Sequence, residues 1–144
     1  LFFLVLLCMG NLNAAAPEVV AVVEGAIQDV SRLPDQKNLA YPDCNYTISV
    51  DLKQIISGSP VPQKIIVIVP GYRQYKATPF VQMKLESGMQ IRLKLVNFEL
   101  LPEQEKSIQL VDDLNDFDRS YWTFTDIIKI NTAHLIRITG LIGT

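Results

Sequence analysis

Aromatic and cationic side chains with chemical potential occur at two places in the chain. Tyr72, Arg73, Tyr75 and Lys76 lie close together in one stretch, and Tyr121-Trp122 form a second pair. Aromatic faces stack on the C–H faces of sugars, and neighbouring polar groups bind sugar hydroxyls. These six residues are therefore the predicted ligand-binding residues, with carbohydrate as the ligand. Aromatic side chains that close the mouth of a small barrel, or pack on another domain, would give the same pattern.

An acidic stretch at residues 112–118 contains Asp112, Asp113, Asp116 and Asp118. Carboxylate and amide oxygens are ligands for calcium. The stretch lacks the central glycine and closing glutamate of an EF-hand loop. We therefore expect a solvated acidic loop, with a calcium site as the alternative.

The residues needed for catalysis are scarce. His134 is the sole histidine, and no carboxylate stands near it in the sequence. The chain has neither a Gly-x-Ser-x-Gly nucleophile elbow nor a phosphate-binding loop. We predict a protein that is not an enzyme and that has no cofactor or metal.

Residues 1–16 resemble a secretory signal peptide without its first part. An uncharged apolar run is followed by Ala14-Ala15-Ala16, as expected before a processing site. The run is too short for a membrane span, which takes about 20 residues. We expect an exported protein, periplasmic or extracellular, with no integral membrane span. An apolar first element of a cytosolic domain, or a lipoprotein anchored at Cys8, are the alternatives.

Charge and cysteine content narrow the possible partners. The formal net charge is −2, and Lys and Arg are scattered, so nucleic acid is not an expected partner. If Cys8 leaves with the leader, Cys44 has no intramolecular partner. It is expected to pack as a small apolar residue, with a reactive thiol as the alternative. Residues 45–47 match the N-glycosylation pattern.

Hydrophobic patterning predicts strands and few helices. Strands are predicted at residues 19–30, with a bulge at Gly25, and at residues 46–56, 64–69 and 89–96. The second and fourth alternate between apolar and polar residues, whereas the third is apolar throughout, as in a strand buried on both faces. A weaker strand is expected near residues 108–110, a loop at 72–78, and short turns or helices at 80–85 and 102–105.

These elements predict a mainly β protein. The leading expectation is an oligonucleotide/oligosaccharide-binding (OB)-like barrel of about five strands with one short helix or turn. An open β-sandwich is the alternative. The expected organisation is a signal peptide at residues 1–16, an OB-like domain at 17–123, and a C-terminal segment at 124–144 that begins a following region.

Several spaced motifs resemble a known module. They are Glu24-Gly25, Leu33-Pro34-Asp35, Tyr41-Pro42-Asp43-Cys44-Asn45-Tyr46-Thr47, Ser57-Gly58, Leu85-x-x-Gly88-Met89-x-Ile91, Ser107-Ile108-Gln109, Asp112-Asp113-Leu114 and Tyr121-Trp122. Across residues 18–123 the chain resembles the β-barrel module of bacterial proteins related to the alginate O-acetyltransferases of the AlgX/AlgJ type. In those proteins an SGNH-hydrolase-like catalytic domain accompanies the module. Their catalytic Ser, Asp and His have no counterpart in this sequence.

The resemblance implies a non-catalytic, exported module of an envelope protein involved in polysaccharide O-acetylation. Its role would be to bind glycan or to dock on the SGNH-like catalytic domain, so polysaccharide and that domain are the expected partners. A freestanding secreted OB-like protein of the TIMP/netrin type, acting as a binding or inhibitor protein, is the alternative.

Overall fold

The computed structural model describes residues 17–114, 116 and 119–130. Three parts of the sequence lie outside the described residues: the expected leader with Cys8, Asp118 of the acidic stretch, and the segment after residue 130 with His134.

The predicted mainly β class is confirmed. In the described part the elements are β1 (Ala21–Val30), η1 (Gln36–Asn38), β2 (Cys44–Gly58), β3 (Lys64–Arg73), β4 (Lys76–Ala77), α1 (Pro79–Gln82), β5 (Gln90–Asn97), η2 (Phe98–Leu100), α2 (Glu103–Lys106), β6 (Gln109–Val111) and β7 (Tyr121–Lys129).

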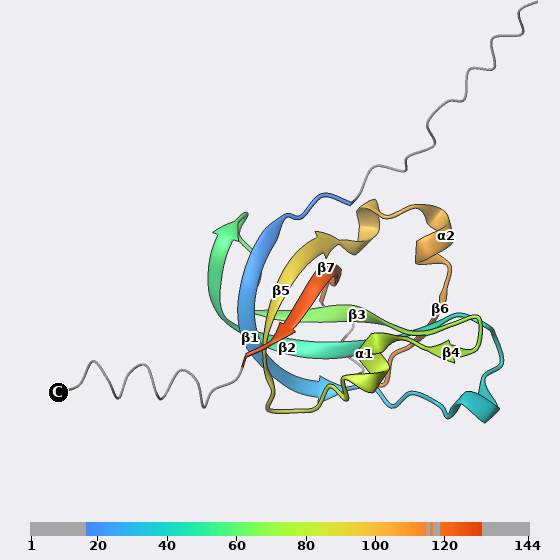
Figure 1. Ribbon diagram of the computed structural model, residues 1–144. Helices are drawn as coiled ribbons and strands as arrows, with labels where there is room; N and C mark the ends of the chain where they lie inside the picture. The colour runs from blue at the N-terminus through green and yellow to red at the C-terminus, as the bar shows by residue number, and fades with distance from the viewer. Residues whose placement is uncertain (1–16, 115, 117–118, 131–144) are drawn as a thin grey trace, which may run out of the picture.

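The strand pairings form a closed circuit. β1 pairs with β2, β2 with β3, β5 with β7 and β5 with β1, all antiparallel. A short parallel pairing of β3 with β7 closes the circuit. The five strands curve around a common centre, while α1, α2, β4 and β6 lie together at one end, on the right in Figure 1. β6 pairs in parallel with the beginning of β2, and β4 pairs with the end of β3.

Gly25 lets one strand serve two neighbours. β1 pairs with both β2 and β5, and its register against β2 shifts between Glu24 and Gly25. A Cβ atom at Gly25 would lie 2.5 Å from the Asp51 carbonyl oxygen, so the strands approach too closely for any side chain. The predicted irregularity at this glycine is confirmed.

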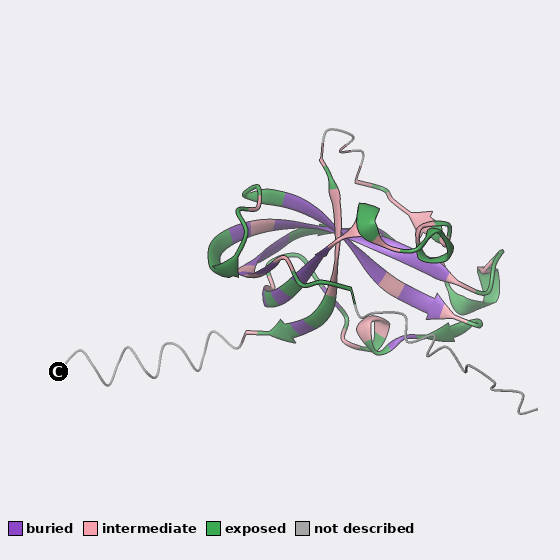
Figure 2. Cartoon of the chain, turned by 90° about the horizontal axis from the view of Figure 1, so that it is seen from above, coloured by how far each residue is buried: buried purple, intermediate pink, exposed green. Residues whose placement is uncertain are grey.

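The core lies inside the circuit of strands. It is built mainly from Val, Ile and Leu side chains of β1, β2, β3 and β5, and Figure 2 shows buried segments on the strands of the sheet. The predicted alternation of β5 is confirmed: Ile91, Leu93 and Leu95 are buried, and Arg92 and Lys94 are exposed. β-Branched side chains suit this pleated, buried surface.

The outer face of β2 and β3 is also buried. Thr47 and Ser49 of β2, and Ile66 and Ile68 of β3, are at most 8% exposed. They belong to the face opposite the core, because Ile48 and Val67 pack inside. The segment with β6 and the residues after it contacts this face, through the β2–β6 pairing and a bond to Thr47. The prediction of a strand buried on both faces is therefore confirmed for residues 65–69, whereas Lys64 is exposed.

Three features differ from the sequence expectation. Seven strands are described rather than about five, because β4 and β7 add to the five strands that the sequence predicts. Tyr72 and Arg73, expected in a loop, continue β3 into a hairpin with β4. The strand β7 was not predicted, and it crosses the expected boundary between residues 123 and 124. In the described part of the chain, no helix has the length and apolar character needed to cross a bilayer.

Candidate binding groove

An open groove lies between two loops that are distant in sequence. Its lining residues are Tyr41, Pro42 and Asp43 on one side and Gln104, Ser107, Ile108 and Gln109 on the other, around a volume of about 330 Å³. The first group precedes β2, and the second runs from α2 into β6. The parallel pairing of β6 with β2, which places Gln109 opposite Cys44, brings the two loops together.

The lining of this groove combines one aromatic ring with hydrogen-bonding groups. Tyr41 is 58% exposed, so its ring is open to a ligand. Gln104 and Gln109 supply amides, and Ser107 supplies a hydroxyl. Asp43 provides the single charge among the described lining residues. A ring with several donors and acceptors around it suits a polyhydroxylated ligand better than an apolar one.

The wall formed by α2 is held by local contacts. Ser107 Oγ donates to the Gln104 carbonyl oxygen at 3.0 Å, and the Ser107 N–H bonds back to Glu103. The Lys106 ammonium lies 2.9 Å from a Glu103 carboxylate oxygen, which raises the pKa of Lys106. Its charge is thus engaged within the helix and is not among those lining the groove.

The β3–β4 hairpin adjoins the groove through its tip residues, Gln74 and Tyr75. The Gln74 N–H donates to Asp43 Oδ1, and the Tyr75 N–H donates to the Pro42 carbonyl oxygen, both at 2.9 Å. Gln36 of η1 donates from Nε2 to the Tyr75 carbonyl oxygen at 2.7 Å. The hairpin tip is therefore fixed to the loop that forms one side of the groove.

The first predicted cluster lies beside the groove but is only partly accessible. Tyr72 is buried, and its hydroxyl donates to the Pro34 carbonyl oxygen, so its ring is not open to a sugar. Arg73 donates to Asn45 Oδ1 at 2.8 Å and to the Tyr72 carbonyl oxygen. Tyr75 and Lys76 are exposed. The structure thus keeps Arg73, Tyr75 and Lys76 together at the hairpin.

The second predicted pair lies in β7, away from the groove lining. Tyr121 and Trp122 pair with Ile66 and Val67 of β3. Trp122 packs against the core, and its Nε1 is buried without a hydrogen-bond partner among the described residues. The two predicted clusters therefore do not form one site.

A buried chain of polar groups holds the segment after β6. Ser31 Oγ and Thr47 Oγ1 are 2.6 Å apart, and Thr47 donates to Asp112 Oδ1 at 3.0 Å. The Tyr121 hydroxyl donates to Asp112 Oδ2 at 2.6 Å, and this bond, with desolvation, raises the pKa of Tyr121 to about 12. This chain of bonds explains why the outer face of β2 is buried.

The carboxylates of the acidic stretch have separate partners. Asp113 accepts the Arg32 N–H at 2.7 Å, and Asp116 pairs with Arg119 at 2.7 Å. Within residues 17–114, 116 and 119–130, no three His, Cys, Asp or Glu residues are grouped as a metal would need. The described carboxylates thus act as structural acceptors.

Cys44 and the glycosylation pattern are both buried. Cys44 is 1% exposed, and burial raises the pKa of its thiol. Asn45 is also buried, and its side-chain oxygen accepts from Arg73. Thr47 of the same pattern is bonded to Asp112. In the folded chain Asn45 is therefore not accessible to a glycosyltransferase.

Sequence reasoning did not find the groove itself. In the sequence, Tyr41-Pro42-Asp43 and Ser107-Ile108-Gln109 stand out only as motifs of the resemblance, and Gln104 carries no pattern that marks it as functional. An aromatic residue in a turn was the available signal for the groove.

Compared with known proteins, the chain matches no family model, and no curated protein or solved structure is significantly similar to it.

Proposed function

We propose that the chain carries a non-catalytic binding module whose ligand is an oligosaccharide held in the groove. The observation that carries this proposal is the exposed Tyr41 ring among the polar groups of Gln104, Ser107 and Gln109. The volume of the groove, about 330 Å³, is in the range of small-molecule sites. A sugar ring stacked on Tyr41 would find donors and acceptors for its hydroxyls on the opposite wall.

The topology supports an OB-like barrel as the framework. The circuit β1–β2–β3–β7–β5–β1 contains five strands. OB-folds are five-stranded, partly open barrels that bind oligosaccharides and oligonucleotides at strands 2 and 3 and at the loops L12 and L45. The two walls of the groove belong to the connections in the same positions, β1–β2 and β5–β7.

The covered face of β2 and β3 restricts where a ligand can lie. Because Thr47, Ser49, Ile66 and Ile68 are buried, a ligand has no access to that part of the sheet. The groove at the loops lies outside this covered part, beside the beginning of β2. This favours a short stretch of glycan bound at one end of the domain over a longer glycan chain that crosses the face of the sheet.

The sequence resemblance supports a place in polysaccharide modification. Two of the motifs that carry it, Tyr41-Pro42-Asp43 and Ser107-Ile108-Gln109, supply six of the seven residues that line the groove. We propose that the protein is exported to the periplasm or cell exterior and serves polysaccharide O-acetylation beside an SGNH-like catalytic domain. Binding of the glycan would keep it near that domain.

Calorimetric titration tests the binding function. The probes are hexamannuronate, O-acetylated hexamannuronate and neutral cellohexaose. We expect at least one to bind, and Tyr41→Ala or Gln109→Ala to weaken that binding about tenfold, since tenfold corresponds to 1.4 kcal/mol of lost contact. Ile128→Ala changes an exposed side chain of β7 outside the groove lining and should leave the affinity unchanged. Absence of binding by all three probes at millimolar concentration would contradict the proposal.

A further inference from the structure

The tip of the β3–β4 hairpin has an unusual backbone. Gln74 has φ +51° and Tyr75 has φ +64°, so both residues are in the left-handed region. Two-residue hairpin turns of this kind normally contain Gly, Asn or Asp, because other side chains are strained there. Such strain persists only when the surroundings impose it, and it is concentrated at functional sites.

The surroundings impose this conformation through three hydrogen bonds. Asp43 Oδ1 and the Pro42 carbonyl oxygen accept the N–H groups of Gln74 and Tyr75, and Gln36 Nε2 donates to the Tyr75 carbonyl oxygen. Two of the three partners belong to the loop that lines the groove. Tyr75 is therefore held in a fixed place relative to Tyr41, which immediately precedes Pro42.

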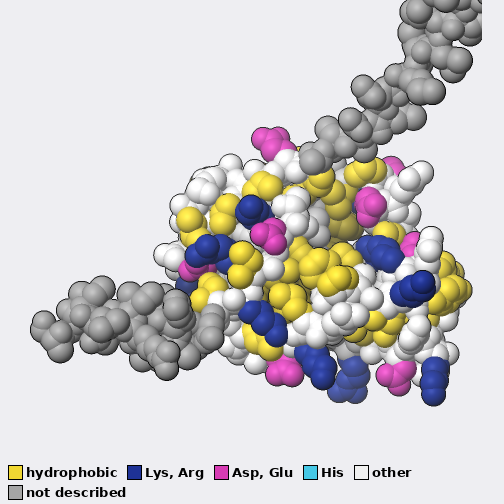
Figure 3. Space-filling model, in the orientation of Figure 1, with side chains coloured by type: hydrophobic (Ala, Val, Ile, Leu, Met, Phe, Trp, Pro, Cys, Tyr) yellow, Lys and Arg dark blue, Asp and Glu magenta, His cyan; other side chains and the backbone are white. Residues whose placement is uncertain are grey.

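Positive charge gathers around Tyr75. Arg73 and Lys76 lie on either side of it in the hairpin. Lys37 follows Gln36, whose side chain donates to the Tyr75 carbonyl oxygen. None of these three cations forms an ion pair with another described residue. Figure 3 shows Lys and Arg side chains at this end of the molecule, where η1 and β4 lie.

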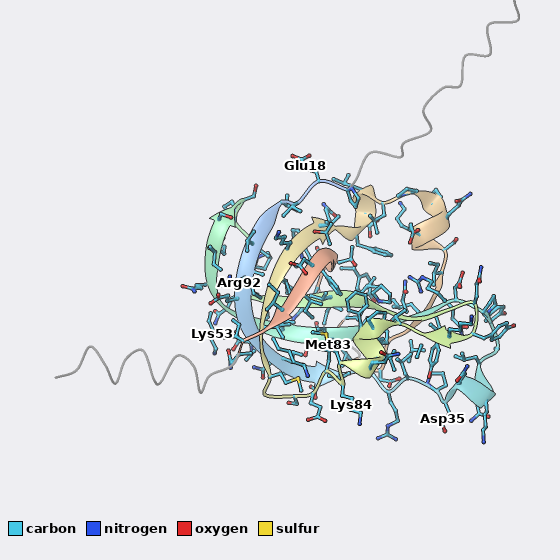
Figure 4. All side chains as sticks on the ribbon, in the orientation of Figure 1. Glu18, Asp35, Lys53, Met83, Lys84 and Arg92 are labelled. Atoms are coloured by element: carbon cyan, nitrogen blue, oxygen red, sulfur yellow. The ribbon has the colours of Figure 1, made fainter. Side chains whose placement is uncertain are left out.

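Two carboxylates also lie near the hairpin, and α2 at the same end carries Glu103 and Glu105. Asp43 accepts the Gln74 N–H, and Asp35 stands before η1, where Figure 4 labels it. Near the hairpin the cationic side chains outnumber these two carboxylates, around an aromatic ring that is 48% exposed. An aromatic ring with cations beside it suits a sugar that carries a carboxylate.

We infer that Tyr75 is the aromatic platform of a second subsite, adjoining the groove, which takes an acidic sugar residue. Lys76 and Lys37 supply positive charge for its carboxylate. This inference rests on the proposed function, and it specifies the ligand as an acidic oligosaccharide long enough to reach from Tyr41 to Tyr75. The strained turn at Gln74 and Tyr75 has the function of presenting the Tyr75 ring to the sugar.

The decisive variant is Tyr75→Asn. Asparagine tolerates the left-handed region, so the variant should keep the hairpin and raise the melting temperature by roughly 4 °C. It removes the ring, so the Kd for hexamannuronate should increase about tenfold. The Kd of any neutral probe that binds should be unchanged, because that probe needs only the groove.

The matched control is Lys84→Asn. Lys84, labelled in Figure 4, also has a left-handed backbone, with φ +52°, but it follows α1 and is not among the residues that line the groove. It should raise the melting temperature in the same way without changing the affinity for hexamannuronate. A second variant, Lys76→Gln, should weaken hexamannuronate binding about threefold and reduce its dependence on salt.

The outcomes separate this inference from the proposed function. If Tyr41→Ala weakens binding while Tyr75→Asn binds hexamannuronate as the wild type does, the groove stands and the second subsite is wrong. A fall in melting temperature for Tyr75→Asn would also overturn the inference, since the turn would not be strained. If the wild type binds cellohexaose but not hexamannuronate, the acidic subsite is rejected while the groove is retained. If the wild type binds none of the probes, both proposals fail.

Discussion

The hydroxyl of Tyr121 donates a hydrogen bond of 2.6 Å to Asp112 Oδ2, while Thr47 donates to the other oxygen of the same carboxylate. The Asp112 side chain therefore connects the beginning of β7 to the first part of β2. The Leu114 N–H also donates to Asp112 Oδ1, at 3.2 Å. Through these bonds Asp112 holds the segment that covers part of the outer face of β2.

The Tyr121–Asp112 bond predicts a loss of stability at high pH. The pKa of Tyr121 is raised from 10 to about 12 in the folded state, because the protonated hydroxyl donates to the carboxylate. A group whose pKa is raised on folding stabilises the protein fully below its unfolded pKa. Its contribution should therefore be present below about pH 10 and disappear as the pH rises to about 12.

Tyr121→Phe tests this pH dependence. Urea unfolding of the variant should show a lower free energy of unfolding near neutral pH and a smaller decline between about pH 10 and pH 12. Some decline will remain, because burial also raises the pKa of Tyr46 to about 12. Identical pH profiles for the wild type and the variant would contradict the assigned role of Tyr121.

Thr47 should be essential for the buried polar chain. Thr47→Val keeps the shape but removes the hydroxyl that bonds both Ser31 Oγ and Asp112 Oδ1, which should cost about 1–3 kcal/mol of unfolding free energy. Thr125→Val, at an exposed position of β7, is the control and should cost less than about 0.5 kcal/mol. Urea unfolding measures both, and equal losses would show that the polar chain adds nothing.

Gly25 and Gly88 should respond differently to the same substitutions. A Cβ at Gly25 would collide with the Asp51 backbone, so Gly25→Ala should cost about 1–3 kcal/mol. Gly88 has φ +92° and open space around it, so Gly88→Ala is penalised through its backbone alone. Asparagine should recover part of the loss at Gly88 and increase the loss at Gly25. Thermal unfolding distinguishes these outcomes, and recovery by asparagine at Gly25 would refute the steric explanation.

Cys44 should be unreactive in the folded protein. Burial limits access to the thiol and raises its pKa, so less of the reactive thiolate forms. Alkylation of Cys44, located by peptide mass spectrometry, should be slower than in urea by on the order of 100-fold, as expected when opening must come first. Comparable rates with and without urea would support the alternative of a reactive thiol.

Local patterns in the sequence were sufficient to predict most of the strands. Alternation in residues 89–96 and the apolar run at 64–69 matched β5 and β3, because the period of side chains along a strand depends on the backbone alone. The bulge at Gly25 was predictable for a similar reason, since glycine marks close approach of backbones. The class of fold followed from these elements without any information about contacts between them.

The strand β7 could not be recognised so readily. It has mixed polarity, with Thr125 and Asp126 exposed, and a register irregularity in its pairing with β5 interrupts the alternation. What makes it a strand is pairing with β5 and β3, which are distant in sequence. Tertiary context therefore outweighs a weak local preference at this point.

The sequence by itself determined the mainly β class, most strand positions, and the neighbourhood of Arg73, Tyr75 and Lys76. Only the tertiary structure decided which aromatic rings are open: it buries Tyr72, packs Trp122 against the core and exposes Tyr41. It also decided that residues 41–43 meet residues 104–109, through the pairing of β6 with β2. Burial and long-range pairing depend on the whole chain, whereas alternation and turn preference depend on neighbouring residues.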